Sequence, residues 1–162
     1  MEALEASLVG LGSTHPGTLR VAGNLGVAQV AAGQRRSGID LIAMNLAARV
    51  RVLGDEHPET LVARDALAAA HRSAGDADTA VALAEEVVVQ RTRTLGVAHP
   101  DTLRSRAGLA LAVAAVGDEA TAHRLLVSAV SDARAALGAD DVHVRTLVDC
   151  GEAHGLLDPE RR

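Results

Sequence analysis

Three histidines recur at a constant spacing of 42 residues, at His15, His57 and His99. Histidine is the commonest metal ligand and a frequent acid–base catalyst, so this pattern first raises the question of a metal or catalytic site. A repeat of this length is expected to form a helical hairpin, and equivalent positions in stacked hairpins lie on the order of 10 Å apart. Zinc, by contrast, needs its ligands about 2 Å from one centre. We therefore expect these histidines to be structural, packing against or hydrogen-bonding to the preceding hairpin.

Cys150 and His154 form a second candidate, because residues four apart share one face of a helix. Glu152 and Asp158 are near them in sequence, but no second Cys/His pair completes a metal site. A Cys–His nucleophile would also need a third group to orient the histidine, and none can be placed. We expect no metal at these residues.

Other familiar chemical patterns are weak or absent. The adjacent carboxylates Glu85-Glu86 and Asp140-Asp141 would point to different faces of a helix and are interpreted as solvated surface. The glycines do not form a G-x-x-x-x-G-K loop, and the chain has no lysine to complete one. The sequence therefore predicts no catalytic residue and no cofactor, and the protein is not expected to be an enzyme.

The elements around the histidines follow a repeated phrase, Leu-Gly-x-x-His-Pro-x-Thr-Leu, at residues 11–19, 53–61 and 95–103. A fourth copy starts at Leu137-Gly138 and then degrades. Proline is favoured at the first position of a helix, and glycine just after the last. In the second repeat we expect one helix from Pro58 to Ala74, ended by Gly75, and a second helix from about 77 to 94.

Details of this hairpin repeat as well. Gly33, Gly75 and Gly117 lie 42 residues apart and are expected in the turn inside each hairpin. Asp76 is expected to cap the second helix, and Arg91 and Arg93 to lie in its last turn near the negative end of the helix dipole. Small residues also align and predict close helix packing: Gly26, Ala68 and Ala110 in the first helices, and Gly38, Ala80 and Ala122 in the second.

Composition limits the class of protein. The 162 residues are 48% apolar without any Phe, Tyr or Trp, and the net charge is −5. A non-specific nucleic-acid binder needs a basic surface or stacking aromatic side chains, so nucleic acid is not expected as a partner. No segment approaches the uninterrupted run of about 18 apolar residues that a membrane-spanning helix needs. With one cysteine and no basic signal sequence after Met1, we expect a cytoplasmic protein without membrane contact.

The phrase resembles the tetratricopeptide repeat of the 42-residue type found in kinesin light chains and many bacterial proteins. A period near 42 also fits HEAT and armadillo arrays, but the His-Pro-x-Thr-Leu phrase favours the tetratricopeptide repeat. All sixteen basic residues are arginine, a bias typical of GC-rich coding, and the chain looks bacterial. The chain departs from the family where an aromatic is usual: the first helices carry Gln29, His71 and Val113. The family asparagine that often bonds a peptide backbone is present only as Asn24, with Ala66 and Gly108 at its counterparts.

The resemblance implies an all-α fold, a right-handed α-solenoid of antiparallel helix hairpins with about eight helices. We expect a single solenoid domain over 1–157, followed by a polar tail at 158–162. Its parts are a partial helix or cap at 1–10, repeats at 11–52, 53–94 and 95–136, and a partial fourth repeat or capping helix at 137–157. The exposed last helix predicts possible self-association through an end of the array.

The first helices of such an array line its concave side. If Leu25, Leu67 and Leu109 face the core, a shallow apolar trough edged by arginines is predicted on the opposite face, for an acidic and apolar protein or peptide partner. Its expected residues are Arg20, Asn24, Val27, Ala31, Val62, Asp65, Ala69, Arg72, Arg104 and Leu111. The alternative is that these small residues only pack on neighbouring helices.

The leading hypothesis is thus a non-catalytic scaffold that binds a protein or peptide on its concave face. The alternative is a self-associating regulatory or oligomerisation segment of a larger multidomain protein. A small-molecule binder or enzyme built on the helical repeat is a third possibility, which would need a closed pocket with convergent polar groups.

Overall fold

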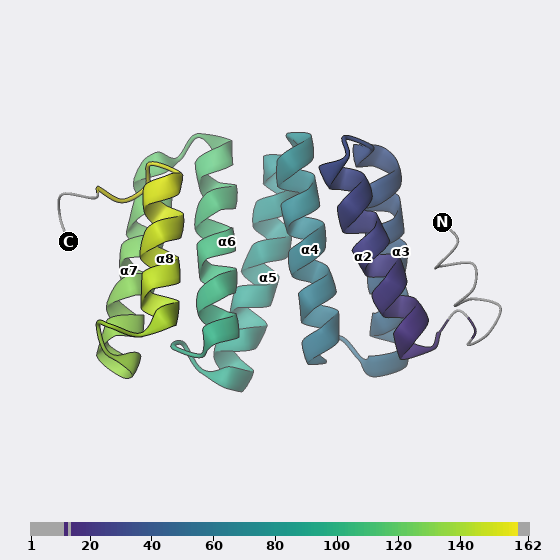
Figure 1. Cartoon of the computed structure of the whole chain (residues 1–162), viewed down its shortest axis with the longest axis horizontal. Helices are drawn as coiled ribbons and strands as arrows, with labels where there is room; N and C mark the ends of the chain where they lie inside the picture. The colour runs from purple at the N-terminus through teal and green to yellow at the C-terminus, as the bar shows by residue number, and fades with distance from the viewer. Residues whose placement is uncertain (1–11, 13, 159–162) are drawn as a thin grey trace. The chain divides into compact units, whose positions relative to one another are not determined.

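The computed structural model describes residue 12 and residues 14–158, and this part of the chain is entirely helical (Figure 1). The predicted all-α class is confirmed. Seven helices are present in the described residues: α2 (Pro16–Ala31), α3 (Arg35–Leu53), α4 (Pro58–Ala74), α5 (Ala77–Leu95), α6 (Pro100–Val116), α7 (Glu119–Leu137) and α8 (Val142–Ala153). The partial helix expected at 1–10 and most of the tail expected at 158–162 lie outside the described residues. In the described residues, no helix combines the length and the apolar character needed to cross a membrane.

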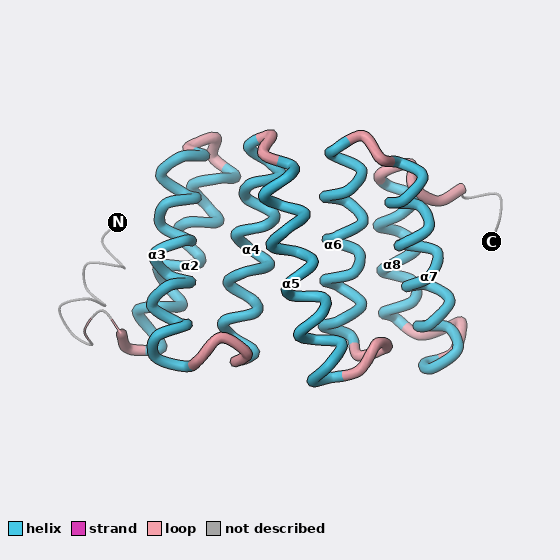
Figure 2. Tube along the Cα trace, turned by 180° about the vertical axis from the view of Figure 1, so that it is seen from behind, coloured by secondary structure: helices cyan, strands magenta, loops and turns pink. Residues whose placement is uncertain are grey.

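The chain divides into two compact units, with the boundary after Asp76, inside the second repeat. In unit 1, α3 packs against both α2 and α4, and α2 also contacts α4. In unit 2, α6 packs between α5 and α7, and α8 contacts both α7 and α6. Figures 1 and 2 show each unit from opposite sides, and within each unit consecutive helices run side by side. This packing of each helix on its neighbours in sequence is typical of a tetratricopeptide solenoid, and the prediction of one domain over 1–157 stays a prediction.

The first helix of each hairpin ends just before the glycine predicted to end it. Gly33, Gly75 and Gly117 have φ angles of 83°, 89° and 97°, values that glycine adopts without strain. Each glycine N–H donates to a carbonyl three residues earlier, and the N–H after it donates to a carbonyl five residues earlier. These paired bonds form a Schellman motif, which satisfies carbonyls that the end of a helix leaves unpaired. The role expected for the three glycines is confirmed.

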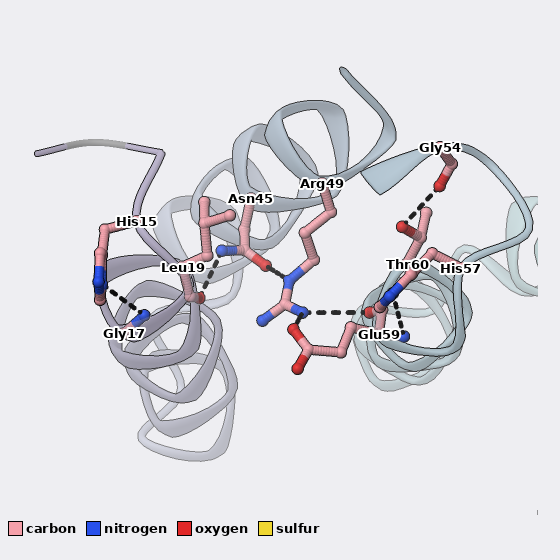
Figure 3. Close-up of polar contacts among 9 residues, drawn as sticks. All are labelled: His15, Gly17, Leu19, Asn45, Arg49, Gly54, His57, Glu59 and Thr60. Carbon is pink, nitrogen blue, oxygen red and sulfur yellow. Dashed lines mark hydrogen bonds and ion pairs between the residues drawn. The ribbon is translucent and has the colours of Figure 1, made fainter. Parts of the chain in front are cut away.

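The helix starts explain the recurring histidines, whose role is structural as expected although their bonding partner differs from the one expected. His57 Nδ1 accepts a hydrogen bond from the Glu59 backbone N–H at 3.2 Å, and His99 Nδ1 accepts from Asp101 at 3.2 Å. His15 does the same with Gly17 at 3.0 Å (Figure 3). Each histidine therefore caps its own helix rather than bonding to the preceding hairpin. A backbone N–H at a helix start has no partner within the helix, so an acceptor side chain stabilises it.

The degraded fourth copy keeps this function with a different residue. Asp141 stands one period after His99, and its carboxylate accepts from the His143 backbone N–H at 2.8 Å. The predicted fourth first-helix follows it directly as α8, beginning at Val142. Capping geometry, not imidazole chemistry, is therefore what the repeated position retains.

Close packing of small residues is confirmed in the α2–α3 hairpin. A Cβ added to Gly26 would lie 2.7 Å from Ile42 Cγ1, and one added to Gly38 would lie 2.7 Å from the Gly26 carbonyl oxygen. In the α6–α7 hairpin the equivalent Ala110 and Ala122 are fully buried in an aliphatic core. Without aromatic side chains to fill wider gaps, the two helices of each of these hairpins approach closely.

Candidate partner-binding grooves

Unit 1 contains a groove of about 300 Å³ between the first helices α2 and α4, with α3 behind it. The walls are mostly small or aliphatic, and the polar groups are few. We call it the unit 1 groove. It is lined by Arg20, Gly23, Asn24, Val27, Ile42, Asn45, Arg49, Glu59, Val62, Ala63 and Ala66. A mostly apolar concavity with a few placed polar groups is typical of a binding site.

A buried hydrogen-bonded network forms part of this groove (Figure 3). Asn45 Nδ2 donates to the Leu19 carbonyl at 2.6 Å, and Arg49 Nε donates to Asn45 Oδ1 at 2.9 Å. Arg49 Nη1 then bonds to Glu59 twice, to the carboxylate Oε2 at 2.5 Å and to the backbone carbonyl at 3.3 Å. The Arg49 side chain is only 9% exposed, whereas that of Glu59 is 54% exposed. The network joins α2, α3 and α4, because its members come from these three helices.

Unit 2 contains a groove of about 530 Å³ in the same register, between α6 and α8. We call it the unit 2 groove. It is lined by Pro100, Asp101, Leu103, Arg104, Ala107, Gly108, Leu111, His143, Thr146, Leu147 and Cys150.

A shift of 84 residues, two repeat periods, relates the two grooves. Under this shift Arg20 corresponds to Arg104, and Val27 corresponds to Leu111. Glu59, Val62 and Ala66 likewise correspond to His143, Thr146 and Cys150, which line the second groove as their counterparts line the first. The repeat therefore builds the same kind of groove once in each unit.

The second unit has its own buried arginine, which sequence reasoning misplaced. Arg91, expected to complement the helix dipole at the end of α5, is 2% exposed. Its Nη1 donates to the Asp101 carbonyl at 2.9 Å and to Ser105 Oγ at 2.6 Å, so it joins α5 to the start of α6. Arg49 lies 42 residues earlier and joins α3 to the start of α4 in the same way. Arg93 is exposed in the last turn, as expected.

Six of the predicted trough residues line one of the grooves. Four of them are in unit 1 and two in unit 2: Arg20, Asn24, Val27 and Val62, and then Arg104 and Leu111. Val27 is 48% and Val62 51% exposed, so both offer apolar area to a partner. The other predicted residues lie on α2 and α4 outside the lining of either groove: Ala31, Asp65, Ala69 and Arg72.

Sequence reasoning missed the contribution of the second helices to the groove. Asn45 and Arg49 lie on α3 and were not predicted to line the groove, and neither was Glu59 in the first turn of α4. The signal was present, because Arg49 and Arg91 are one period apart at the end of a second helix, ten residues before an acidic residue. A repeated charge at an otherwise apolar register is the pattern that would have revealed the buried network.

A further hollow of about 450 Å³ lies along α7 and α8. His123 Nδ1 is 2.7 Å from the Leu156 carbonyl at its edge, and Val127 is 43% exposed within it. This hollow lies partly on α8, the last helix, which was predicted to be exposed at the end of the array.

The structure also shows how the residues first considered for chemistry are arranged. His154 Nδ1 is 2.8 Å from the Cys150 backbone carbonyl. Within residue 12 and residues 14–158, no three His, Cys, Asp or Glu side chains gather as a metal ion would require.

Comparisons with known proteins agree with the fold. Residues 60–101 match the sequence model of a family described as tetratricopeptide repeat. The chain is also similar to two solved structures of kinesin light chain-like, nearly identical TPR-like repeats from Podosopora anserina. One of these, a point variant, has a TM-score of 0.77 at 29% identity, and the match covers 94% of this chain and 74% of that one. The other has a TM-score of 0.75 with the same identity and coverage, 29%, 94% and 74%. No curated protein matches the chain. The resemblance drawn from the repeated phrase is confirmed.

Proposed function

We propose that this chain, a tetratricopeptide-repeat protein, is a non-catalytic scaffold that binds a segment of a partner protein along the first helices of its repeats. Tetratricopeptide repeats generally serve as scaffolds for protein–protein interaction. The observation that carries the proposal is the recurrence of one groove in the same register of both units. Each groove has aliphatic walls and an arginine from the same repeat position, Arg20 or Arg104.

The chemistry of the grooves favours a protein segment over a small substrate. Their linings are dominated by Gly, Ala, Val and Leu, with few polar groups to position a reacting molecule. Side chains of an extended or helical segment bind such a surface through apolar contacts, while its backbone or charged groups meet the polar residues at the rim. Asn24, the retained family asparagine, lines the unit 1 groove and offers an amide for a backbone bond. A cytoplasmic location belongs to the same proposal, and the single cysteine supports it.

Site-specific photo-crosslinking in cells of the source organism tests this function. A photoreactive amino acid placed at Val62 or Thr146 probes the two grooves, and the same residue at Met44, which is 71% exposed on α3, is the matched control. We expect discrete crosslinked partner proteins from the groove positions and not from Met44. Crosslinking that is equal at all three positions, or confined to Met44, would show that the grooves are not the binding surface.

A further inference from the structure

We infer that the unit 1 groove binds a carboxylate side chain of the partner, and that the Glu59 carboxylate occupies this position until the partner displaces it. This inference rests on the proposed function and adds to it the charge of the partner and the residue that competes with it. It depends on three observations: donors left unused in the groove, the unequal burial of Arg49 and Glu59, and the different composition of the unit 2 groove.

The unit 1 groove has more cationic donors than its own residues satisfy. Arg49 uses Nε and Nη1 in its network, and its Nη2 makes no hydrogen bond within the described residues. The Arg20 side chain, exposed on α2, likewise forms no ion pair or hydrogen bond in the described part of the chain. Two guanidinium groups therefore line the groove with one carboxylate, that of Glu59, which leaves one positive charge uncompensated. An anionic group on the partner is the complement of this surface.

Arg49 is fixed, while the Glu59 carboxylate is free to leave. If the Glu59 side chain rotates toward solvent, Arg49 keeps its bonds to Asn45 Oδ1 and to the Glu59 backbone carbonyl. The guanidinium thus stays in place, and the position that the Glu59 carboxylate held on Nη1 becomes available to an incoming carboxylate. Because the Glu59 side chain is already 54% exposed, its carboxylate regains water at little cost. One carboxylate is exchanged for another on the same arginine.

The unit 2 groove lacks this arrangement. Two periods after Asn45, Arg49 and Glu59 the chain has Ala129, Ala133 and His143. The groove arginine, Arg104, is 2.9 Å from the Asp101 carboxylate on its own helix and so is already paired. We therefore expect the unit 2 groove to select apolar side chains and the unit 1 groove to select an acid.

A random 12-residue peptide display library selected on the whole chain tests the inference. Peptides enriched by the wild type are synthesised with a fluorescent label, and their binding is measured by fluorescence anisotropy, including copies in which each Asp or Glu is replaced by Asn or Gln. We expect enriched peptides to combine an acidic residue with aliphatic ones. Neutralising that acid, or Arg20→Ala, should weaken binding about tenfold at low salt, the loss of one charge-assisted contact. Glu59→Gln should tighten it several-fold by removing the competitor. The control is Arg51→Ala, an exposed arginine at the end of α3 that lines neither groove, and it should leave the binding unchanged.

The possible failures are distinguishable. Enriched peptides without acidic residues, or binding that Glu59→Gln weakens, would overturn the inference and leave the proposed function standing. If the wild type enriches no peptide at all, both the inference and binding of an extended segment are contradicted. Arg20 and Glu59 are exposed, so both variants are expected to fold, and the result does not depend on replacing the buried Arg49.

Discussion

Replacing the repeated histidines tests whether capping is their function. In His57→Ala the Glu59 backbone N–H loses the Nδ1 acceptor that lies 3.2 Å away. Loss of a helix N-cap costs about 0.5–2 kcal/mol, and because this bond is long for an N–H donor we expect about 0.5–1 kcal/mol at each site. The three sites lie a repeat apart and share no partners, so the triple variant with alanine at 15, 57 and 99 should lose about 1.5–3 kcal/mol.

The decisive variant is His57→Asp. Aspartate already caps α8 from the equivalent position, Asp141, with a bond of 2.8 Å. An aspartate at 57 should therefore retain the stability that alanine loses, helped by the positive end of the helix dipole. Asp141→Ala is the matched cap deletion in the fourth copy, and Asp140→Ala, an exposed neighbour, is the neutral control.

Urea and thermal denaturation followed by far-UV circular dichroism measure these changes. For a chain of this size, each single cap deletion should lower Tm by about 1–4 °C. If His57→Asp is as destabilised as His57→Ala, or if the triple alanine variant keeps the stability of the wild type, capping is not what the histidines contribute. An imidazole required for another reason would show the first of these two results.

Three further predictions concern packing, buried charge and pH. Gly38→Ala should destabilise the protein by about 1–2 kcal/mol in a urea titration, because its Cβ would lie 2.7 Å from the Gly26 carbonyl oxygen and overpacking outweighs the gain in helix propensity. Gly108→Ala is the control: its added Cβ would have no neighbouring atom within 4 Å, so it should stabilise by up to about 1 kcal/mol. Arg91→Ala should cost about 3–5 kcal/mol by denaturation, since it removes two bonds from a charged donor and leaves a cavity, whereas Arg93→Ala on the exposed side should change little. The Thr121 hydroxyl and backbone N–H, and then Arg124, hold the pKa of the Asp118 carboxyl below its ordinary value of 3.8. The stability that Asp118 contributes is therefore present above pH 3.8 and is lost as the pH falls through the lower pKa of the folded state. In thermal melts, the advantage of wild type over Asp118→Ala should shrink only below about pH 4, and an advantage already lost at about pH 6 would contradict this.

Much of the fold could be predicted because the residues that begin and end its helices act through their own local backbone conformation. Pro58 and Gly75 set the ends of α4 through their own backbone restrictions, which do not depend on tertiary contacts. The same argument located α8, although its phrase is degraded, because Asp141 performs the capping that histidine performs elsewhere. What failed was the reason given for the histidines, since a spacing shows that a position recurs and not which atom its side chain contacts.

The site was only partly predictable, because some of its polar groups come from second helices, which were not expected to line it. Arg91 was expected only to complement the helix dipole at the end of its helix. Its long aliphatic stem is buried instead, and the guanidinium bonds to acceptors such as the Asp101 carbonyl. Arg49 escaped notice for the same reason. The first-helix positions were easier, since Arg20 and Val27 follow a helical period from the predicted helix start.

The repeat therefore separates two kinds of position. Glycine, proline and the capping residue recur wherever the backbone must turn, so they fix the register in every copy. The junction after a second helix does not recur uniformly: Arg49 contacts Glu59, Arg91 contacts Asp101, and Ala133 stands where a third arginine would be. Loss of that arginine leaves the unit 2 groove without the buried charge of the unit 1 groove. On the proposed function, specificity depends on residues behind the groove as well as along its first helices, and we expect the two grooves of one register to select different side chains.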